Sequence, residues 1–169
     1  MMTDALVLPS VADAYRGGMR QLAAGVCLIT TRFNHLPGGM IATAVTSVSA
    51  EPPTLLVCVN RSASMFEMIA KSGHFCVNVL AAEALELVDV FSNSARRDER
   101  FATGQWQDDA QGSPMAADAL VAFSCRVANT VDWHTHAIFL GEVTEVMHPK
   151  VDGRPLVYLD RGFHQLSEL

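Results

Sequence analysis

Long apolar runs, paired cysteines and basic patches are all missing from this chain of 169 residues. No apolar stretch approaches the ~20 residues that a bilayer-spanning helix needs, so we expect no membrane segment. Lys and Arg total 12 against 18 Asp and Glu, which disfavours nucleic-acid and anionic-membrane partners because phosphate groups attract basic stripes. The first ten residues have no basic region before an apolar run, so we expect no secretory signal. These absences favour a cytoplasmic protein.

The four cysteines form no CxxC pair, and each lies in an apolar, strand-like run: Cys27, Cys58, Cys76 and Cys125. We predict small buried thiols in a reducing cytoplasm, with a disulfide as the lesser alternative.

Familiar catalytic motifs are also absent. No GxGxxG follows a predicted strand, which excludes the usual Rossmann nicotinamide site. The chain contains no GxxxxGK[ST], HExxH or GxSxG, so no known motif indicates phosphoryl transfer, zinc-dependent hydrolysis or acyl transfer.

The hydrophobic fraction of 50% and the length favour one globular domain over residues 1–169. Short β-branched and apolar runs predict strands at 25–33, 40–49, 54–60, 74–80, 119–133, 135–148 and 155–160. The double proline of "AEPP" separates the second strand from the third, and the third is apolar enough to be buried on both faces. Because few helical crossovers separate the strands, we expect an antiparallel barrel with short helices outside it.

Three helices are predicted. Residues 10–24 carry an apolar face of Val11, Tyr15, Met19 and Leu22, with Ser10 as the cap. A second helix starts with a capping box, Ser64 and Glu67, and ends at Gly73. The third covers 81–92. The turns are placed at 34–39 and near 132–135, and the polar segment 92–118 is expected to be a functional loop or a lid.

The predicted strand "MIATAVTSVS" contains an unusual number of hydroxyl and small side chains. In a continuous strand Thr43, Val45, Ser47 and Ser49 share one side. Small side chains would let a flat ring reach the backbone, but Thr is also simply a good strand former.

The segment "NRSASMFE" begins a helix, whose free amides and dipole attract anions. Ser62, Ser64 and Arg61 would suit one phosphate, although Ser64 could also be an ordinary helix cap. The densest basic cluster, Arg96, Arg97 and Arg100 after Ser92, could share that phosphate or be a solvated loop.

Two histidines, His134 and His136, are two residues apart on a predicted strand and therefore share a face. No third metal ligand stands nearby in the sequence, so we predict no metal site. His136 begins an apolar strand and is the better placed of the two to reach a cleft.

These landmarks together resemble the short-chain flavin reductases, the FMN-binding split-barrel reductase components of two-component flavin-dependent monooxygenases. The resemblance covers about residues 15–166 and is carried by "LAAGVCLITT", "GMIATAVTSVSAEPPTLLVCVN", "FCVNVL", "FS" with "RF", "HAIFLGEV" and "PLVYLDRGFHQL". It implies a mainly β (α+β) fold, an antiparallel split β-barrel of the FMN-binding type with short flanking helices. It also implies a homodimer and hydride transfer from NADH or NADPH to FMN or FAD, which supplies reduced flavin to a partner monooxygenase.

The same resemblance implies site residues. Thr43, Ala44, Val45 and Thr46 would line the flavin ring. Its ribityl phosphate would be held by Asn60, Ser62, Ser64, Ser92 and Arg100. His136 matches the histidine of the family's Gly-Asp-His motif, near the nicotinamide, but His134 and Thr135 replace the Gly-Asp. Tyr158, Phe163 and the 92–113 loop could cover the nicotinamide side or only pack the barrel end. The competing hypothesis is a flavin-binding electron carrier or sensor without a donor site.

Overall fold

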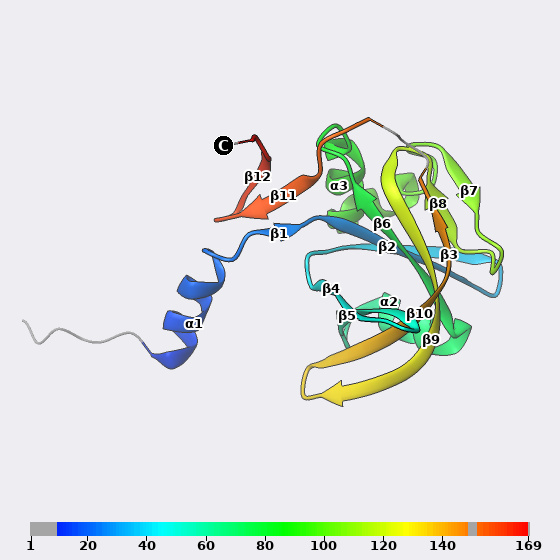
Figure 1. Cartoon of the computed structure of the whole chain (residues 1–169), viewed down its shortest axis with the longest axis horizontal. Coiled ribbons are helices and arrows are strands. Elements are labelled where there is room, and N and C mark those ends of the chain that lie inside the picture. Colours follow the sequence, from blue (N-terminus) through cyan, green and yellow to red (C-terminus); the bar gives the residue numbers. More distant parts are fainter. Residues whose placement is uncertain (1–9, 149–151, 169) are drawn as a thin grey trace, which may run out of the picture.

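The structure is a computed structural model that describes residues 10–148 and 152–168 (Figure 1). Residues 1–9, where we expected no secretory signal, lie outside the described part. Within the described ranges, no helix has the length and apolar character to cross a bilayer.

The main element is a seven-stranded sheet in which every neighbouring pair is antiparallel. Its strands, in spatial order, are β3 (Leu36–Ala42), β2 (Cys27–Phe33), β6 (His74–Leu80), β9 (Ala119–Trp133), β10 (His136–Met147), β5 (Pro53–Asn60) and β4 (Val45–Ala50). The two edge strands, β3 and β4, are consecutive in the chain and are joined by only Thr43 and Ala44. The edges therefore meet at this point, and the curved sheet closes into a barrel that is split there. The predicted split barrel is confirmed.

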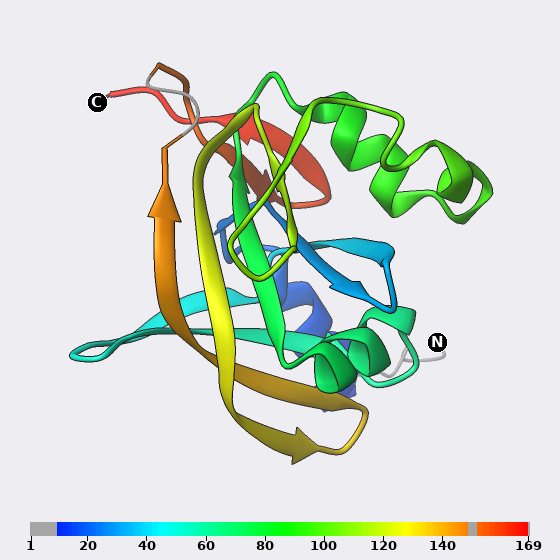
Figure 2. The same cartoon turned by 90° about the vertical axis from the view of Figure 1, so that its right-hand side faces the viewer.

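Two smaller sheets and the helices lie around this barrel. The first sheet contains β1 (Ala24–Gly25), β11 (Leu156–Leu159) and β12 (Gly162–Gln165), and the second contains β7 (Trp106–Asp108) and β8 (Pro114–Ala116). The helices are α1 (Val11–Met19), α2 (Ser64–Ser72), α3 (Leu85–Ser92) and a 3₁₀ helix, η1 (Ser94–Glu99). Figure 2 shows α2 near one end of the long strands β9 and β10 and α3 near the other. α1 stands away from the barrel (Figure 1) and buries no residue.

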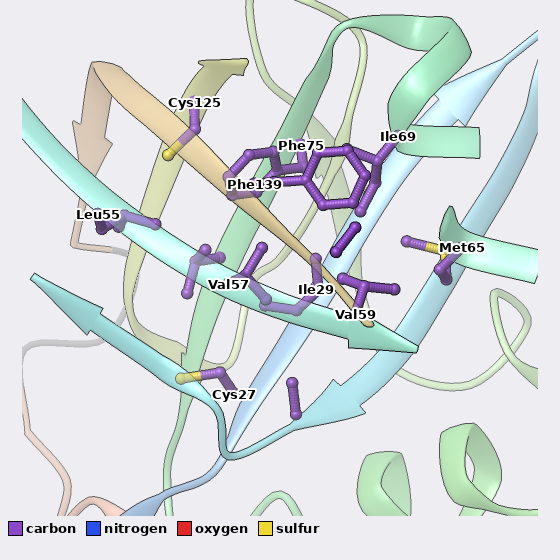
Figure 3. Close-up of a cluster of buried hydrophobic side chains, with 13 residues drawn as sticks. Cys27, Ile29, Leu55, Val57, Val59, Met65, Ile69, Phe75, Cys125 and Phe139 are labelled. Carbon is purple, nitrogen blue, oxygen red and sulfur yellow. The ribbon is translucent and has the colours of Figure 1, made fainter. Parts of the chain in front are cut away.

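The barrel interior is filled by the inward side chains of several strands and of α2. Phe75 and Phe139 lie at its centre, fully buried, with Ile29, Val57 and Val59 around them (Figure 3). Alternate residues of β5 point into this core, which is the strand periodicity that the sequence predicts. Burial of these apolar side chains supplies most of the stabilisation of such a fold.

The helix α3 covers a second apolar cluster on the outside of the sheet. Leu28 and Leu80 pack there against Val90 and Phe91. Fully buried Asn78 fastens the same region, because its amide donates to the Leu28 carbonyl at 2.9 Å and accepts from the Ala116 N–H at 2.8 Å. The strand β2 is thus buried on both of its faces.

Several element boundaries differ from the prediction. The strand predicted over 40–49 is two strands, since the chain leaves β3 after Ala42 and enters β4 at Val45. The turn predicted over 34–39 is a two-residue turn, in which Asn34 and His35 both adopt positive φ and let β3 begin at Leu36. The segment 92–118 contains η1, β7 and β8 and is not a bare loop.

Helix limits also differ. The first helix ends at Met19, just after its two glycines, and the third begins at Leu85, four residues later than predicted. The predicted capping box at Ser64 is wrong, because the N-cap of α2 is Ala63 and it makes no side-chain cap bond. The predicted end at Gly73 is confirmed, with φ of 74°.

Two burial predictions need correction. The strand β5 buries only one face, since Leu56 and Cys58 remain half-buried on the other. All four cysteines are free thiols; Cys27, Cys76 and Cys125 are buried as expected, whereas the prediction is wrong for Cys58, which is only half-buried. Burial raises the pKa of the Cys27 thiol to about 11, which keeps it protonated and unreactive.

Candidate functional site

The split in the barrel lies at Thr43 and Ala44. These two exposed residues belong to neither edge strand, and the Ala44 carbonyl accepts from the Cys58 N–H at 3.0 Å. The alternation that placed Thr43 beside Val45 and Ser47 therefore does not apply across this bend. Their short side chains are exposed where the two edge strands of the sheet meet.

The start of α2 borders a pocket of about 340 Å³ that polar side chains line together with Phe33 and Met68. Ser62 and Ser64 line it with Arg61, Lys71 and Glu67, and Lys71 is ion-paired with Glu67 at 2.7 Å. Because Ala63 supplies no capping oxygen, the first amides of this nine-residue helix have no side-chain acceptor. Free amides, hydroxyl groups and nearby cations together fit a phosphate group.

Asn60 and His136 connect this pocket to the sheet. The Asn60 side-chain oxygen accepts from the Ser62 amide at 2.9 Å and from the Ser62 hydroxyl at 2.8 Å. Asn60 is the register partner of His136 on β10, so the two exposed side chains lie on the same face of the sheet. Thr135 lies beside His136, with its hydroxyl 2.9 Å from the imidazole Nδ1.

His134 is not a strand neighbour of His136. Trp133 pairs with His136, so His134 lies in the turn between β9 and β10 with φ of 49°. The two histidines therefore do not share a strand face as predicted. No group of three or more His, Cys, Asp or Glu side chains suited to a metal ion occurs in the described ranges.

A second pocket, of about 400 Å³, brings together Thr43 and Ser92. It is bounded by the ends of β3 and α3 and by the hairpin of β11 and β12. Tyr158 and Phe163 contribute aromatic rings whose centroids are 5.4 Å apart. Arg161, in the turn of this hairpin, lines the same pocket.

Val45 and Thr46 line a third, mainly apolar pocket of about 270 Å³ beneath β4, with Cys27, Val77 and Phe123. The predicted ring-binding segment Thr43–Thr46 thus runs from the second pocket to the third.

Arg100 lines none of these three pockets. Its guanidinium donates to the Phe91 carbonyl at 3.0 Å and to the Val90 and Gly39 carbonyls at 3.4 Å. It thereby satisfies the open C-terminal carbonyls of α3, an arrangement that the helix dipole favours. Burial, with a smaller contribution from Arg97, lowers the pKa of this guanidinium. Arg100 thus supports the helix end that carries Ser92.

Two pocket-lining cations were missed by the sequence reasoning. Lys71 lies seven residues after Ser64 on α2, and that helical spacing could have indicated a shared face. Arg161 follows Asp160 and precedes Gly162, a turn-like trio between two short apolar strands that could have indicated an exposed hairpin tip.

Known proteins are similar to this chain in sequence and in fold. Residues 19–167 match the family described as "Flavin reductase like domain". "FMN reductase (NADH) RutF" of Stutzerimonas stutzeri (strain A1501) is 41% identical over 165 residues, covering 98% of this chain and 94% of that protein.

Solved structures are similar throughout. A putative flavin reductase from Haemophilus somnus 129PT superposes with a TM-score of 0.87 at 34% identity, covering 94% of this chain and 100% of that one. BorF, "the Flavin Reductase Component of a Bacterial Two-Component Tryptophan Halogenase", gives a TM-score of 0.84 at 31% identity, covering 94% and 99%. The split barrel and the matched residues together show that this chain belongs to the flavin reductase like domain family.

Proposed function

We propose that residues 1–169 form a single cytoplasmic flavin reductase domain that transfers a hydride from NADH to FMN. Relatives named as NADH-dependent FMN reductases, at about two-fifths identity over most of the chain, support this donor and this flavin. We further propose that the reduced flavin diffuses to a partner monooxygenase. BorF, the flavin reductase component of a two-component tryptophan halogenase, supports such a two-component arrangement.

The chain's own residues position the reactants. The flavin supplies the redox chemistry, because its N5 accepts a hydride from nicotinamide C4. Thr43–Thr46 present small side chains and open backbone to the ring, and Ser62, Ser64 and the amides of α2 hold the phosphate. His136 would orient the nicotinamide toward the flavin ring. No nucleophilic side chain is required.

The observation that carries this proposal is the connection between the uncapped start of α2 and the split. Asn60 bonds Ser62 on one side and pairs with His136 on the other, while Ala44 bonds Cys58 two residues earlier on β5. An anion site and an open backbone edge thus share one strand. A ligand with a planar ring and an anionic tail fits this spacing.

Anaerobic stopped-flow mixing tests the function. Purified protein with FMN or FAD is mixed with NADH or NADPH, and the flavin absorbance is followed. We expect rapid bleaching with NADH and FMN and repeated turnover in air. Bleaching with neither donor would favour the alternative, a flavin-binding carrier or sensor.

Variants connect the activity to the site. Ser62→Ala with Ser64→Ala should raise the KM for FMN, and the exposed Ser167→Ala serves as the matched control. His136→Ala should slow turnover or weaken nicotinamide binding, and an unchanged rate with unchanged affinity would remove His136 from the site.

We also propose a homodimer, because the outer face of the sheet at β5, β10 and the end of β9 is apolar and is not covered by another described element. Ile138 on β10 has Cys58 and Val131 as register partners, and Leu140 has Leu56. All five therefore lie on one outward face, beside His136 and Asn60. The exposed apolar face of α1 is a second uncovered surface: Val11, Tyr15 and Met19 are 88%, 65% and 44% exposed. A second copy would cover both.

Light scattering after size exclusion tests the dimer. Ile138→Asp should reduce the mass from that of a dimer to that of a monomer. Val146→Asp, at an exposed position near the other end of β10, should leave it unchanged. A monomeric wild-type protein would refute the dimer.

A further inference from the structure

The turn between β11 and β12 holds an arginine in an unusual backbone conformation. Asp160 and Arg161 have φ of 44° and 66°, between the paired residues Leu159 and Gly162. Such two-residue turns favour Asn and Gly, because positive φ is costly for a side chain with a Cβ. The positive φ of Arg161 therefore costs conformational energy, and nothing within the turn itself offsets that energy.

This turn is firmly held. The Asp160 N–H donates to the Arg20 carbonyl at 3.0 Å, and Tyr158 pairs with Ala24 of β1. The ring of Phe163 packs on that of Tyr158. Figure 1 shows the β11–β12 pair beside β1, at the edge of the barrel. Arg161 is therefore presented from a fixed hairpin and not from a loose loop.

The pocket beside the turn has a composition that suits a nucleotide. Val26, Ile41 and Ala42 line it with apolar side chains, Tyr158 and Phe163 contribute aromatic rings, and Thr43 and Ser92 contribute hydroxyl groups. Arg161 is the only charged side chain among the residues that line it. Its volume of about 400 Å³ is in the range of ligand pockets. No hydrogen bond or ion pair joins the Arg161 guanidinium to another residue of the described chain.

Several other arginines of the described chain form ion pairs, including Arg61 with Asp132 at 2.8 Å and Arg32 with Asp108 at 2.7 Å. The phosphate pocket at α2 has its own cations, Arg61 and Lys71, and lies at a different place on the chain. A nicotinamide dinucleotide brings a second anionic group, the diphosphate, which needs a separate partner. The pocket that shares Thr43 with the proposed flavin wall offers Arg161 for it.

We propose that Arg161 binds the diphosphate of the nicotinamide dinucleotide, so that the β11–β12 turn forms the donor-binding edge of the reductase site. This inference rests on the proposed function. Guanidinium and phosphate groups form charge-assisted, often bidentate hydrogen bonds, and the aromatic pair supplies a face for one of the donor's rings.

Steady-state kinetics test the assignment. Arg161→Gln removes the charge, and Arg161→Gly also suits the positive φ of the turn, so a defect common to both is not one of folding. We expect the KM for NADH to rise about tenfold in both, since one charge-assisted hydrogen bond is lost. The KM for FMN should stay unchanged. Arg154→Gln, an exposed arginine outside this pocket, is the matched control.

A truncated donor separates binding from chemistry. 1-Benzyl-1,4-dihydronicotinamide carries the reactive ring without any phosphate, so its rate should be the same in wild type and both variants. High salt should raise the KM for NADH more in the wild type than in the variants, because it screens the lost attraction.

Three results would overturn the assignment: an unchanged KM for NADH, a rise in the KM for FMN instead, or an equal loss with the truncated donor. Calorimetry with ADP-ribose distinguishes failure of this inference from failure of the proposed function, because this ligand has the diphosphate but no hydride to give. Binding that weakens about tenfold in Arg161→Gln supports the assignment even if no donor bleaches the flavin, and equal binding refutes it.

Discussion

Gly39 lies where the strand β3 passes the ring of Phe91, and a single added methyl group tests that packing. A Cβ at this position would lie 2.9 Å from Phe91 Cδ1 and closer still to Cε1. Real Cβ atoms essentially never approach other heavy atoms this closely, so the ring would have to move. The φ of Gly39 is not positive, so Ala adds no backbone strain and the effect comes from packing alone.

Neighbouring side chains prevent the Phe91 ring from moving away. Phe91 is 3% exposed and meets Phe101 edge-on at 5.3 Å and Trp106 at 5.8 Å between centroids. The Arg100 guanidinium lies 5.6 Å from its centroid. Overpacking of a rigid core site costs about 1–3 kcal/mol. With a shift of about 2–4 °C per kcal/mol for a chain of this size, Gly39→Ala should lower the Tm by about 2–12 °C.

Thermal unfolding followed by circular dichroism, at one protein concentration and without ligand, measures this shift. Gly25→Ala is the control, because a Cβ there meets no atom within 4 Å. Adding Phe91→Leu to Gly39→Ala should recover part of the loss, and a double-mutant cycle isolates that coupling. A Tm within about 1 °C of wild type, or an equal fall in Gly25→Ala, would refute the packing argument.

Three further substitutions test other parts of the molecule. Asn78→Leu leaves the Ala116 N–H unsatisfied in the core and should cost about 1–3 kcal/mol in urea unfolding; an unchanged midpoint would contradict it. Burial lowers the pKa of His74 below its ordinary 6.5, so the unfolded chain takes up its proton first and stability falls as pH drops below that value. His74→Gln should show a smaller fall between about pH 7.5 and about pH 5, and parallel falls would exclude this cause. Asn60→Ala frees the Ser62 amide and hydroxyl and should raise the KM for FMN with little change in Tm; an unchanged KM would show that this bond does not organise the phosphate pocket.

Local patterns were sufficient to predict most strands. The alternation of Leu55, Val57 and Val59 is a local property of the sequence, and these side chains point into the core. The double proline separates β4 from β5 as expected, since β4 ends at Ala50 and β5 begins at Pro53. Gly73 ends its helix because it adopts the left-handed conformation that favours glycine.

The break at Thr43–Ala44 has no such local signal. Both residues suit a strand, and no glycine or proline marks a turn. The break arises because Ala42 pairs with Cys27 on β2 whereas Val45 pairs with Val57 on β5, on the opposite edge of the sheet. Which strands become neighbours is a property of the tertiary structure, and the hydrophobic periodicity of a single sequence does not predict it.

The start of α2 was misplaced for a different reason. Ser64 and Glu67 have the spacing of a capping box, but the Asn60 side chain binds the Ser62 amide first and fixes the turn before the helix. Asn commonly makes this bond to the amide two residues on. The segment "NRS" therefore indicated this turn. The capping-box spacing of Ser64 and Glu67, which lies nearer the helix, led to the wrong prediction.

Arg100 shows the limit of reasoning from charge. Its place in a basic cluster predicted an anion as its partner, yet its guanidinium donates to three main-chain carbonyls. The last carbonyls of a helix carry partial negative charge and have no partner within the helix. A cation close in sequence to a helix end can therefore use its hydrogen-bond donors to stabilise that end. Only the three-dimensional structure distinguishes this role from ligand binding.

The position of the site follows from how the barrel closes. In a fully closed barrel every strand is paired on both sides, so no edge remains. Here the two edge strands are joined by two residues that belong to neither strand. Backbone at such a point can meet a ligand without breaking a ladder. Large side chains there would fill the opening. The small residues Thr43 and Ala44 are therefore needed to let the ligand reach the backbone. Replacing Ala44 by Leu should accordingly weaken FMN binding far more than it lowers the Tm, and an equal effect on both would mean that the split is ordinary packing.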